Sequence, residues 1–293
     1  MLTETPNPRS TQIDQLPTLD ILQIMNEEDA SVAAAVQRAL PQIAQAVDVI
    51  VERLRAGGRL IYAGAGTSGR LGVLDAVECV PTFSTNPELV QGMLAGGDRA
   101  LTHSIEGAED DRALGRADLL ARHVSARDVV VGIAASGRTP YVIGALEAAN
   151  EAGAATIGIA CNEPAPLLDA AQIRIAALVG PEIIAGSTRL KSGTAQKMIL
   201  NMLSTASMIR LGKVYGNRMV DVKVTNQKLA RRAQGMVAEI GGVSEAEAAD
   251  LLVASGNHAK VAIVMARRGV SADEARALLA AANGHLRPVI DPA

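Results

Sequence analysis

The stretch Leu60–Arg70 reads LIYAGAGTSGR, in which an apolar run leads directly into a glycine-rich turn. Leu60–Ala63 has the length and composition of a buried strand. The turn Gly64–Gly69 matches the pattern GxGxxG, and such a turn between a strand and a helix presents backbone N–H groups to a phosphate. The stretch therefore predicts the first strand, turn and helix of a doubly wound α/β sheet.

Further strand signals follow at intervals that leave room for helices. The expected strands are apolar along most of their length, and they lie at Leu89–Leu94, Asp128–Ile133, Ala155–Ala160 and Arg174–Leu178. Strands of this kind, separated by helices, are typical of a parallel sheet that is covered on both faces. We therefore predict an α/β fold with a doubly wound parallel sheet and a small C-terminal module of three helices.

The boundaries of these parts follow from breaks in the pattern. Gly57-Gly58 ends a section that contains a polar arm and helices. Near the C-terminus, Ser244–Glu247 and Ser271–Glu274 have the spacing of capping boxes, which start helices. The expected division is an N-terminal arm with helices, an α/β domain, a connecting segment and a helical module, at residues 1–56, 57–213, 214–234 and 235–293.

The composition is that of a globular protein and excludes several classes. Of the 293 residues, 48% are hydrophobic and 20% are charged. With three Tyr, one Phe and no Trp the chain has almost nothing to stack on bases, and its net charge of −3 offers no counter-charge to nucleic acid or to anionic lipid. The two cysteines and four histidines lack metal-ligand spacing, so no metal is expected. A polar N-terminus, with no apolar run of about 18 residues, predicts a cytoplasmic protein that does not contact a membrane.

Two later segments repeat the chemistry of the first turn. Residues 134–139 read AASGRT after an apolar strand, and residues 186–194 read GSTRLKSGT at the start of a long helix. Helix capping explains a single Ser in either segment. Three such loops favour a phosphate site, because turns at the carboxyl ends of parallel strands meet at one edge of the sheet. The candidate phosphate-binding residues are Gly66, Thr67, Ser68, Ser136, Gly137, Arg138, Thr139, Ser187, Thr188 and Lys191.

A nicotinamide-dependent dehydrogenase is the alternative that the pattern GxGxxG raises first. Its ribose-binding acidic residue is expected about 20 residues further on, but the stretch Leu89–Gly97 ends in Ala95-Gly96-Gly97. Thr67 and Ser68 also bring hydroxyls, which suit the several acceptor oxygens of a phosphate monoester. A phosphate monoester is therefore favoured over a dinucleotide.

Two groups of carboxylates are candidates for acid and base chemistry. Glu106–Asp111 lies at an expected helix start, where acidic side chains usually do no more than complement the helix dipole. Glu78 lies toward the end of the helix that leaves the first turn, where a carboxylate is unfavourable. That placement suggests a role for Glu78 beyond stability.

Four motifs together closely resemble the N-acetylmuramic acid 6-phosphate etherases, and they lie at Gly64–Gly72, Glu106–Asp110, Gly132–Tyr141 and Gly193–Lys197. Asn217–Leu229, which includes Thr225-Asn226, extends a likeness that covers nearly the whole chain. The resemblance implies a sugar isomerase (SIS) domain at 57–213 and a small ubiquitin-associated-like fold at 235–293. It also implies a homodimer with the active site near the subunit boundary, and no metal or organic cofactor.

The resemblance further implies an activity and two catalytic residues. Etherases of this family release D-lactate from N-acetylmuramic acid 6-phosphate and leave N-acetylglucosamine 6-phosphate. By similarity, Glu78 donates a proton to the departing lactate oxygen, and Glu109 is the partner acid or base. The chain departs from the family's pattern beside the first carboxylate, where Val77 replaces the usual Ser and Val80 precedes Pro81.

Two further alternatives stay open. An aldose-ketose isomerase that acts on a sugar phosphate would also open the ring and move the proton at C2, and an assay for lactate separates it from an etherase. A sugar-phosphate sensor would bind without turnover. Transcriptional sensors of that kind carry a basic helix-turn-helix ahead of the SIS domain, whereas Met1–Ala56 contains the acidic run Glu27-Glu28-Asp29 and no basic cluster.

Overall fold

The computed structural model of the chain describes residues 1–222 and 227–291. Thr225 and Asn226, which contribute to the resemblance above, lie outside the described residues. The chain divides into two compact units. An α/β unit comprises Met1–Val77 and Pro87–Ser204, and a helical unit comprises Glu78–Asn86 and Thr205–Ala293.

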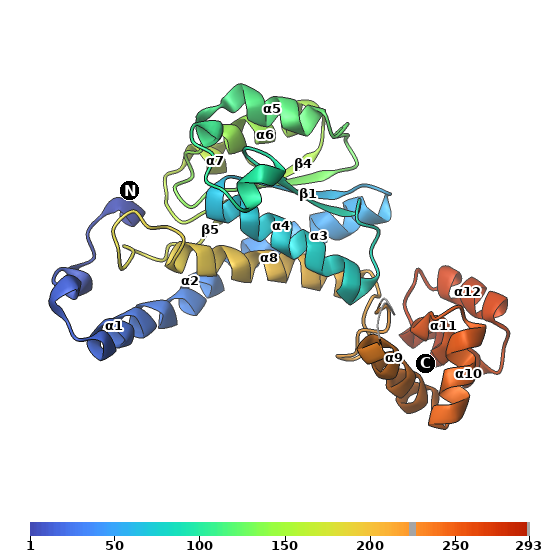
Figure 1. The fold of residues 1–293 in the computed structure, drawn as a ribbon. Helices are drawn as coiled ribbons and strands as arrows, with labels where there is room; N and C mark the ends of the chain where they lie inside the picture. Colours follow the sequence, from blue (N-terminus) through green and yellow to red (C-terminus); the bar gives the residue numbers. More distant parts are fainter. Residues whose placement is uncertain (223–226, 292–293) are drawn as a thin grey trace. The chain divides into compact units, whose positions relative to one another are not determined.

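The α/β unit is built on one parallel sheet of five strands, as the sequence predicts (Figure 1). Its order is β2-β1-β3-β4-β5, and every neighbouring pair is parallel. The residues of β1, β3 and β4 are all buried, in agreement with their mostly apolar sequences. The strand bounds are β1 Leu60–Gly64, β2 Val90–Leu94, β3 Val129–Ile133, β4 Ala155–Ala160 and β5 Ile173–Ala176.

Helices cover both faces of this sheet, with α5, α6 and α7 on one face and α3, α4 and α8 on the other (Figure 1). The helices that begin in this unit are α1 Thr18–Ala30, α2 Val32–Arg38, α3 Leu40–Arg55, α4 Gly66–Phe83, α5 Arg112–Leu120, α6 Pro140–Glu151, α7 Pro166–Asp169 and α8 Lys191–Arg210. Short 3₁₀ turns lie at Leu2–Glu4, Pro8–Ser10, Ile13–Gln15, Asp98–Leu101 and Ala108–Asp110. Among the described residues, no helix is both long and apolar enough to cross a membrane.

Small residues let the backbones of α5 and α6 touch. A Cβ atom on Gly115 would lie 1.9 Å from the carbonyl oxygen of Tyr141, and one on Gly144 would lie 2.1 Å from that of Arg112. The core beneath these helices is rich in alanine, and one Ala-rich face of α6 is buried against the sheet. Close backbone packing therefore builds this core with few aromatic rings.

The order of the strands positions the functional site. Both β2 and β3 pair with β1, one on each side, so the direction of winding reverses between β1 and β3. In parallel sheets, ligands bind at the carboxyl ends of the strands where this reversal occurs. The two loops at that point are the segments that follow Gly64 and Ile133.

An ion pair joins the opposite, amino ends of β1 and β3. The Arg59 guanidinium donates to both carboxylate oxygens of Asp128 at 3.1 and 2.9 Å, and its backbone N–H donates at 2.9 Å. Ser125 adds donors from its N–H and its hydroxyl. Burial by itself raises the pKa of Asp128, which is 2% exposed, but the hydrogen bonds from Arg59 and Ser125 outweigh it and hold the pKa below its ordinary value.

The helical unit contains α9 Gln227–Gly241, α10 Glu245–Ala254, α11 Ala259–Arg268, α12 Ala272–Ala281 and α13 Arg287–Ile290. The capping box expected at Ser271 is complete, because Ser271 and Glu274 each accept the other's backbone N–H. At Ser244 only half of the box forms, with the serine hydroxyl accepting from the backbone of Glu247. The three helices that the sequence predicts for the C-terminal module are present as α10, α11 and α12, and the described residues add α9 before them and α13 after them.

Lys260 is buried in the helical unit and ties three of its segments together. Its Nζ atom donates to the carbonyl oxygens of Gly212 and Gly284 at 2.8 and 3.0 Å, and to the carboxylate of Asp221 at 2.6 Å. Burial lowers the pKa of Lys260, and Asp221 partly offsets this effect. These bonds satisfy all three ammonium hydrogens, which is what allows a lysine to be buried.

Replacing Asp128 by Asn keeps the shape of the side chain and removes its charge. We expect Asp128→Asn to lower the free energy of unfolding at neutral pH by about 1–3 kcal/mol, because it weakens hydrogen bonds to a charged acceptor. A lowered pKa stabilises the fold above the carboxyl's ordinary value, and the contribution is lost as the pH falls through the folded-state pKa. Urea unfolding of both proteins should therefore show their difference narrowing on acidification to about pH 3. A constant difference would contradict this account.

Candidate functional site

A pocket of ≈ 380 Å³ lies at the carboxyl edge of the sheet, beside the loops that follow β1 and β3. A smaller pocket of ≈ 240 Å³ shares Ala65, Gly66 and Glu109 with it. The larger pocket is lined by Met1, Glu4, Ala65, Gly66, Thr67, Ser68, Glu109, Asp110, Ala134, Ala135, Ser136, Arg138, Thr139, Pro140, Gly186 and Thr188. All three loops predicted to bind phosphate thus contribute to one pocket.

The first loop places Gly66, Thr67 and Ser68 at the start of α4. The N–H groups in the first turn of a helix have no partner within the helix, so they can donate to an anion. The hydroxyl of Ser68 donates to Oε1 of Gln196 at 2.9 Å, so its proton is already used within the protein. Ser68 is therefore suited to bind an anion through its backbone rather than through its side chain.

The second loop offers a hydroxyl proton that the first does not. The Oγ atom of Ser136 accepts the backbone N–H of Arg138 at 3.2 Å, which leaves its O–H available to donate into the pocket. Arg138 is exposed and Thr139 is half-buried, and both line the pocket. Gly137 is buried in the left-handed region at φ +68°, where a Cβ would lie 2.4 Å from that of Ala165. Gly137 shapes this turn and is not part of the lining.

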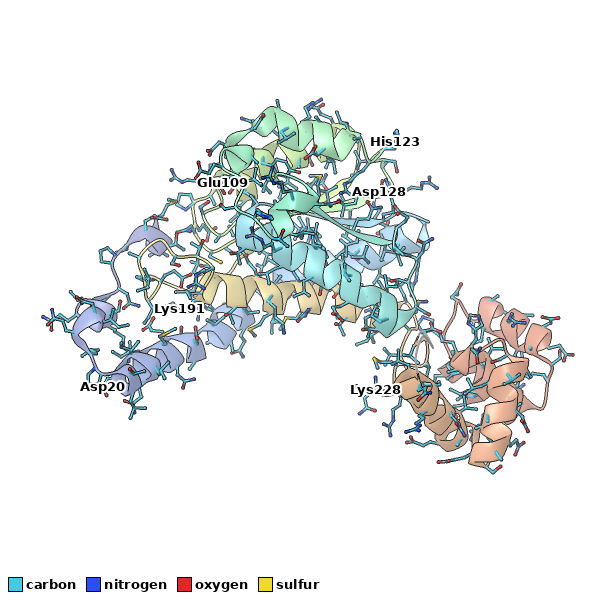
Figure 2. The ribbon with its side chains drawn as sticks, viewed as in Figure 1. Asp20, Glu109, His123, Asp128, Lys191 and Lys228 are labelled. Carbon is cyan, nitrogen blue, oxygen red and sulfur yellow. The ribbon has the colours of Figure 1, made fainter. Side chains whose placement is uncertain are left out.

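The third loop contributes Gly186 and Thr188, but not Ser187 or Lys191. Lys191, labelled in Figure 2, is the first residue of α8 and is 3% exposed. Its ammonium group pairs with Glu28.

An internal carboxylate occupies the start of α8. Glu182 is fully buried and accepts the backbone N–H groups of Lys191 and Ser192, each at 2.9 Å, together with the Ser192 hydroxyl. These are the amides that an external anion would otherwise use at a helix start. The third loop therefore reaches the pocket through Thr188 alone among its predicted residues.

The two predicted carboxylates lie in different units. Glu109, labelled in Figure 2, is exposed in the 3₁₀ turn Ala108–Asp110 and lines the pocket together with Asp110. Glu78 belongs to the helical unit, where its side chain is exposed on α4. Within the described residues, no group of three or more His, Cys, Asp or Glu could hold a metal ion.

Sequence reasoning missed the contribution of the N-terminal arm, which brings Met1 and Glu4 to the pocket. The sequence gives little indication of this contribution, because short polar segments with prolines are typical of flexible chain termini. The pocket combines hydroxyls, helix-start amides and one arginine with carboxylates at Glu4, Glu109 and Asp110. The hydroxyls, amides and arginine are hydrogen-bond donors that can bind a phosphate, and carboxylates can transfer protons. The arrangement therefore suits acid and base chemistry on a phosphorylated ligand.

Three protein-family models match the chain. They are the glucokinase regulatory protein N-terminal SIS domain at residues 42–150, the SIS domain at residues 116–206 and the C-terminal lid domain of glucokinase regulatory protein at residues 216–261. A phosphoheptose isomerase structure from Francisella tularensis aligns with a TM-score of 0.50 at 20% identity, over 66% of this chain and 100% of the isomerase. The α/β unit therefore has the SIS fold.

Relatives of known name match almost the whole chain. A protein of Photorhabdus laumondii is 53% identical over 290 residues, which cover 99% of this chain and 96% of the relative. A protein of Rhodopirellula baltica is 56% identical over 286 residues, which cover 98% and 95%. Both are named N-acetylmuramic acid 6-phosphate etherase.

The difference between the two serine hydroxyls leads to a prediction about phosphate binding. We expect Ser136→Ala to weaken binding of a sugar 6-phosphate about tenfold relative to the unphosphorylated sugar, which is the effect of losing one hydrogen bond to a charged group. Ser68→Ala is the matched control, because the proton of that hydroxyl is given to Gln196, and it should change the preference less. Titration calorimetry with both sugars measures the ratio. An unchanged preference in Ser136→Ala would count against a phosphate site here.

Proposed function

Because the chain belongs to the N-acetylmuramic acid 6-phosphate etherase family, we propose that it cleaves the lactyl ether of N-acetylmuramic acid 6-phosphate. The products are D-lactate and N-acetylglucosamine 6-phosphate, as in the recycling of cell-wall amino sugars. The observation that carries the proposal is the pocket itself, in which three hydroxyl-bearing loops surround the same space as Glu109. We also propose that the reaction takes place in the cytoplasm, as expected from the sequence.

The chemistry is an elimination followed by a hydration. In the open-chain sugar the aldehyde acidifies the proton on C2, and a base removes it. The bond between C3 and the lactyl oxygen then breaks, and the departing oxygen receives a proton from an acid. Water adds to C3 of the unsaturated aldehyde while C2 regains a proton. One water molecule is consumed, and no oxidant or reductant is needed.

The site residues divide between holding the phosphate and moving protons. We propose that the first-turn amides of α4, with Ser136, Arg138, Thr139 and Thr188, hold the phosphate. These groups would fix the sugar and leave its C2 and C3 atoms to the carboxylates. Glu109, which lines the same pocket, would be one acid or base. Glu78 would protonate the departing lactate, as the family resemblance implies.

We propose that the protein is a homodimer with shared sites, as the family resemblance implies. Glu109 lines the pocket of its own subunit. Glu78 would act on the sugar in the pocket of the partner subunit.

A direct assay tests the activity and both catalytic roles. The purified protein should convert N-acetylmuramic acid 6-phosphate into equal amounts of D-lactate and N-acetylglucosamine 6-phosphate. We expect Glu78→Gln and Glu109→Gln to fold but to lose turnover by a factor of roughly 10² or more, the usual contribution of a general acid or base. A coupled lactate dehydrogenase assay measures turnover, and circular dichroism checks the fold.

The products also separate the alternatives. A ketose phosphate without lactate would indicate an aldose-ketose isomerase, and binding without any product would indicate a sensor. Near-normal rates in both variants would remove the proposed roles of Glu78 and Glu109 even if lactate were released.

Mixing the two inactive variants tests the shared site. If Glu78 and Glu109 at one site come from different subunits, each mixed dimer of Glu78→Gln with Glu109→Gln contains one intact site. Random mixing in equal amounts should therefore restore about a quarter of wild-type activity, because half of the dimers are mixed and each has one working site of two. The measurement is lactate release after co-expression or joint refolding. If both carboxylates came from one subunit, no mixed dimer would have an intact site and activity would stay at the level of the variants.

A further inference from the structure

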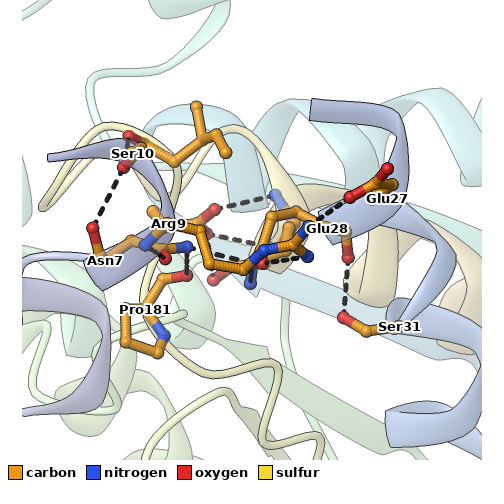
Figure 3. A network of polar contacts seen from close by, with 11 residues as sticks. Asn7, Arg9, Ser10, Glu27, Glu28, Ser31 and Pro181 are labelled. Carbon is orange, nitrogen blue, oxygen red and sulfur yellow. Dashed lines mark hydrogen bonds and ion pairs between the residues drawn. The ribbon is translucent and has the colours of Figure 1, made fainter. Parts of the chain in front are cut away.

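The N-terminal segment Met1–Ser10 is bonded along its length to the loop that precedes α8. The backbone N–H of Gly186 donates to the carbonyl oxygen of Thr3 at 2.8 Å. The side chain of Asn7 donates to the carbonyl of Pro181 at 3.3 Å, and the hydroxyl of Ser10 donates to that of Ile183 at 2.7 Å. Figure 3 shows Asn7 and Pro181 at this junction. The segment is therefore a fixed part of the fold.

Thr3 connects two loops that line the pocket. It is fully buried, and both its N–H and its hydroxyl bond to the side chain of Asn162, at 3.3 and 3.0 Å. Asn162 in turn donates to the carbonyl of Ala135 at 2.9 Å. Ala135 and Gly186 both line the pocket. A buried polar residue with satisfied hydrogen bonds holds its surroundings in one arrangement, so Thr3 fixes the position of the residue that follows it.

Ionic contacts hold the other end of the segment (Figure 3). Glu28 on α1 accepts from the side chains of Asn7 and Arg9 at 3.0 and 3.2 Å and pairs with Lys191 at the start of α8. Burial raises the pKa of Glu28, but the hydrogen bonds from Lys191 and Asn7 outweigh it, and the pKa lies below its ordinary value. Glu28 therefore stays charged at neutral pH and keeps the segment in place.

Glu4 is the side chain that this support presents to the pocket. Its carboxylate lies over Gly186, where an added Cβ would be 2.9 Å from Oε2. Glu4 is exposed, and it lines the pocket together with Ser136, Thr188 and Glu109. An ionised carboxylate only accepts hydrogen bonds. It is therefore unsuited to the phosphate and suited to the hydroxyl or amide N–H groups of a sugar.

We propose that Glu4 is a substrate-binding residue, which accepts a hydrogen bond from a hydroxyl or the acetamido N–H of the bound sugar. Met1–Ser10 is then a wall of the active site, and its role is to orient the sugar against the phosphate-binding loops. This inference rests on the proposed function, because it concerns the same pocket. We assign Glu4 to binding, whereas Glu109 and Glu78 are the proposed proton-transfer groups, so the loss of Glu4 is expected to affect binding more than the chemical step.

Steady-state lactate release by the full-length protein tests the proposal. We expect Glu4→Gln to raise KM about tenfold while kcat stays within about threefold of wild type, because a hydrogen bond present in both the ground and transition states is weakened. Asp14→Asn is the matched control, since it removes the same charge from an exposed position in the N-terminal arm outside the pocket. Its kinetics should equal those of wild type. The unfolding temperature of each protein, measured by calorimetry, shows that the fold is intact.

Two further measurements separate a failure of the role proposed for Glu4 from a failure of the proposed activity. Calorimetric binding of N-acetylglucosamine 6-phosphate should weaken in Glu4→Gln by the same factor as KM rises. Thr3→Val should also raise KM and, unlike Glu4→Gln, lower the unfolding temperature, because it removes a buried hydrogen bond. Wild-type KM and affinity in Glu4→Gln would overturn the role of Glu4 while leaving the etherase proposal intact. A wild-type protein that neither releases lactate nor binds the product would overturn both.

Discussion

The pairing of β1 with β3 is the interaction on which the site depends. These strands lie side by side although another strand separates them in the sequence, and the reversal of winding between them brings the turns after Gly64 and Ile133 together. Arg59 and Asp128 join the same two strands at their amino ends, whereas the pocket lies at their carboxyl ends. Parallel pairing thus separates the contacts that stabilise the fold from the candidate ligand-binding groups, so that a substitution at one end of the strands need not affect the other end.

The hydroxyl groups at this edge are not equivalent, and their partners decide what each can do. Ser68 gives its proton to Gln196, whereas Ser136 accepts a backbone N–H and keeps its proton. The start of α8 is closed to ligands because Glu182 already satisfies its amides. The three loops look alike in the sequence but leave different groups available at the pocket: amides from the first, a hydroxyl and a cation from the second, and one threonine from the third.

Sequence patterns predict the fold more completely than they predict the site. Apolar runs predict the strands well, because a buried strand needs only a few consecutive apolar residues. The glycine-rich turns that follow two of these strands predict the position of the pocket. The sequence does not reveal that Lys191 is already paired. Its partner Glu28 is 163 residues away, and no neighbouring residue indicates that the ammonium group forms an ion pair within the protein. The same holds for Thr3, which is buried against Asn162. Contacts between distant segments decide which candidate groups stay available to a ligand, and a local pattern does not contain that information.

The position of the chain's first residue has a practical consequence for handling the protein. Met1 lines the pocket and Thr3 is fully buried. An affinity tag fused ahead of Met1 would therefore begin beside the pocket. Kinetic work is therefore best done on protein from which an N-terminal tag has been removed.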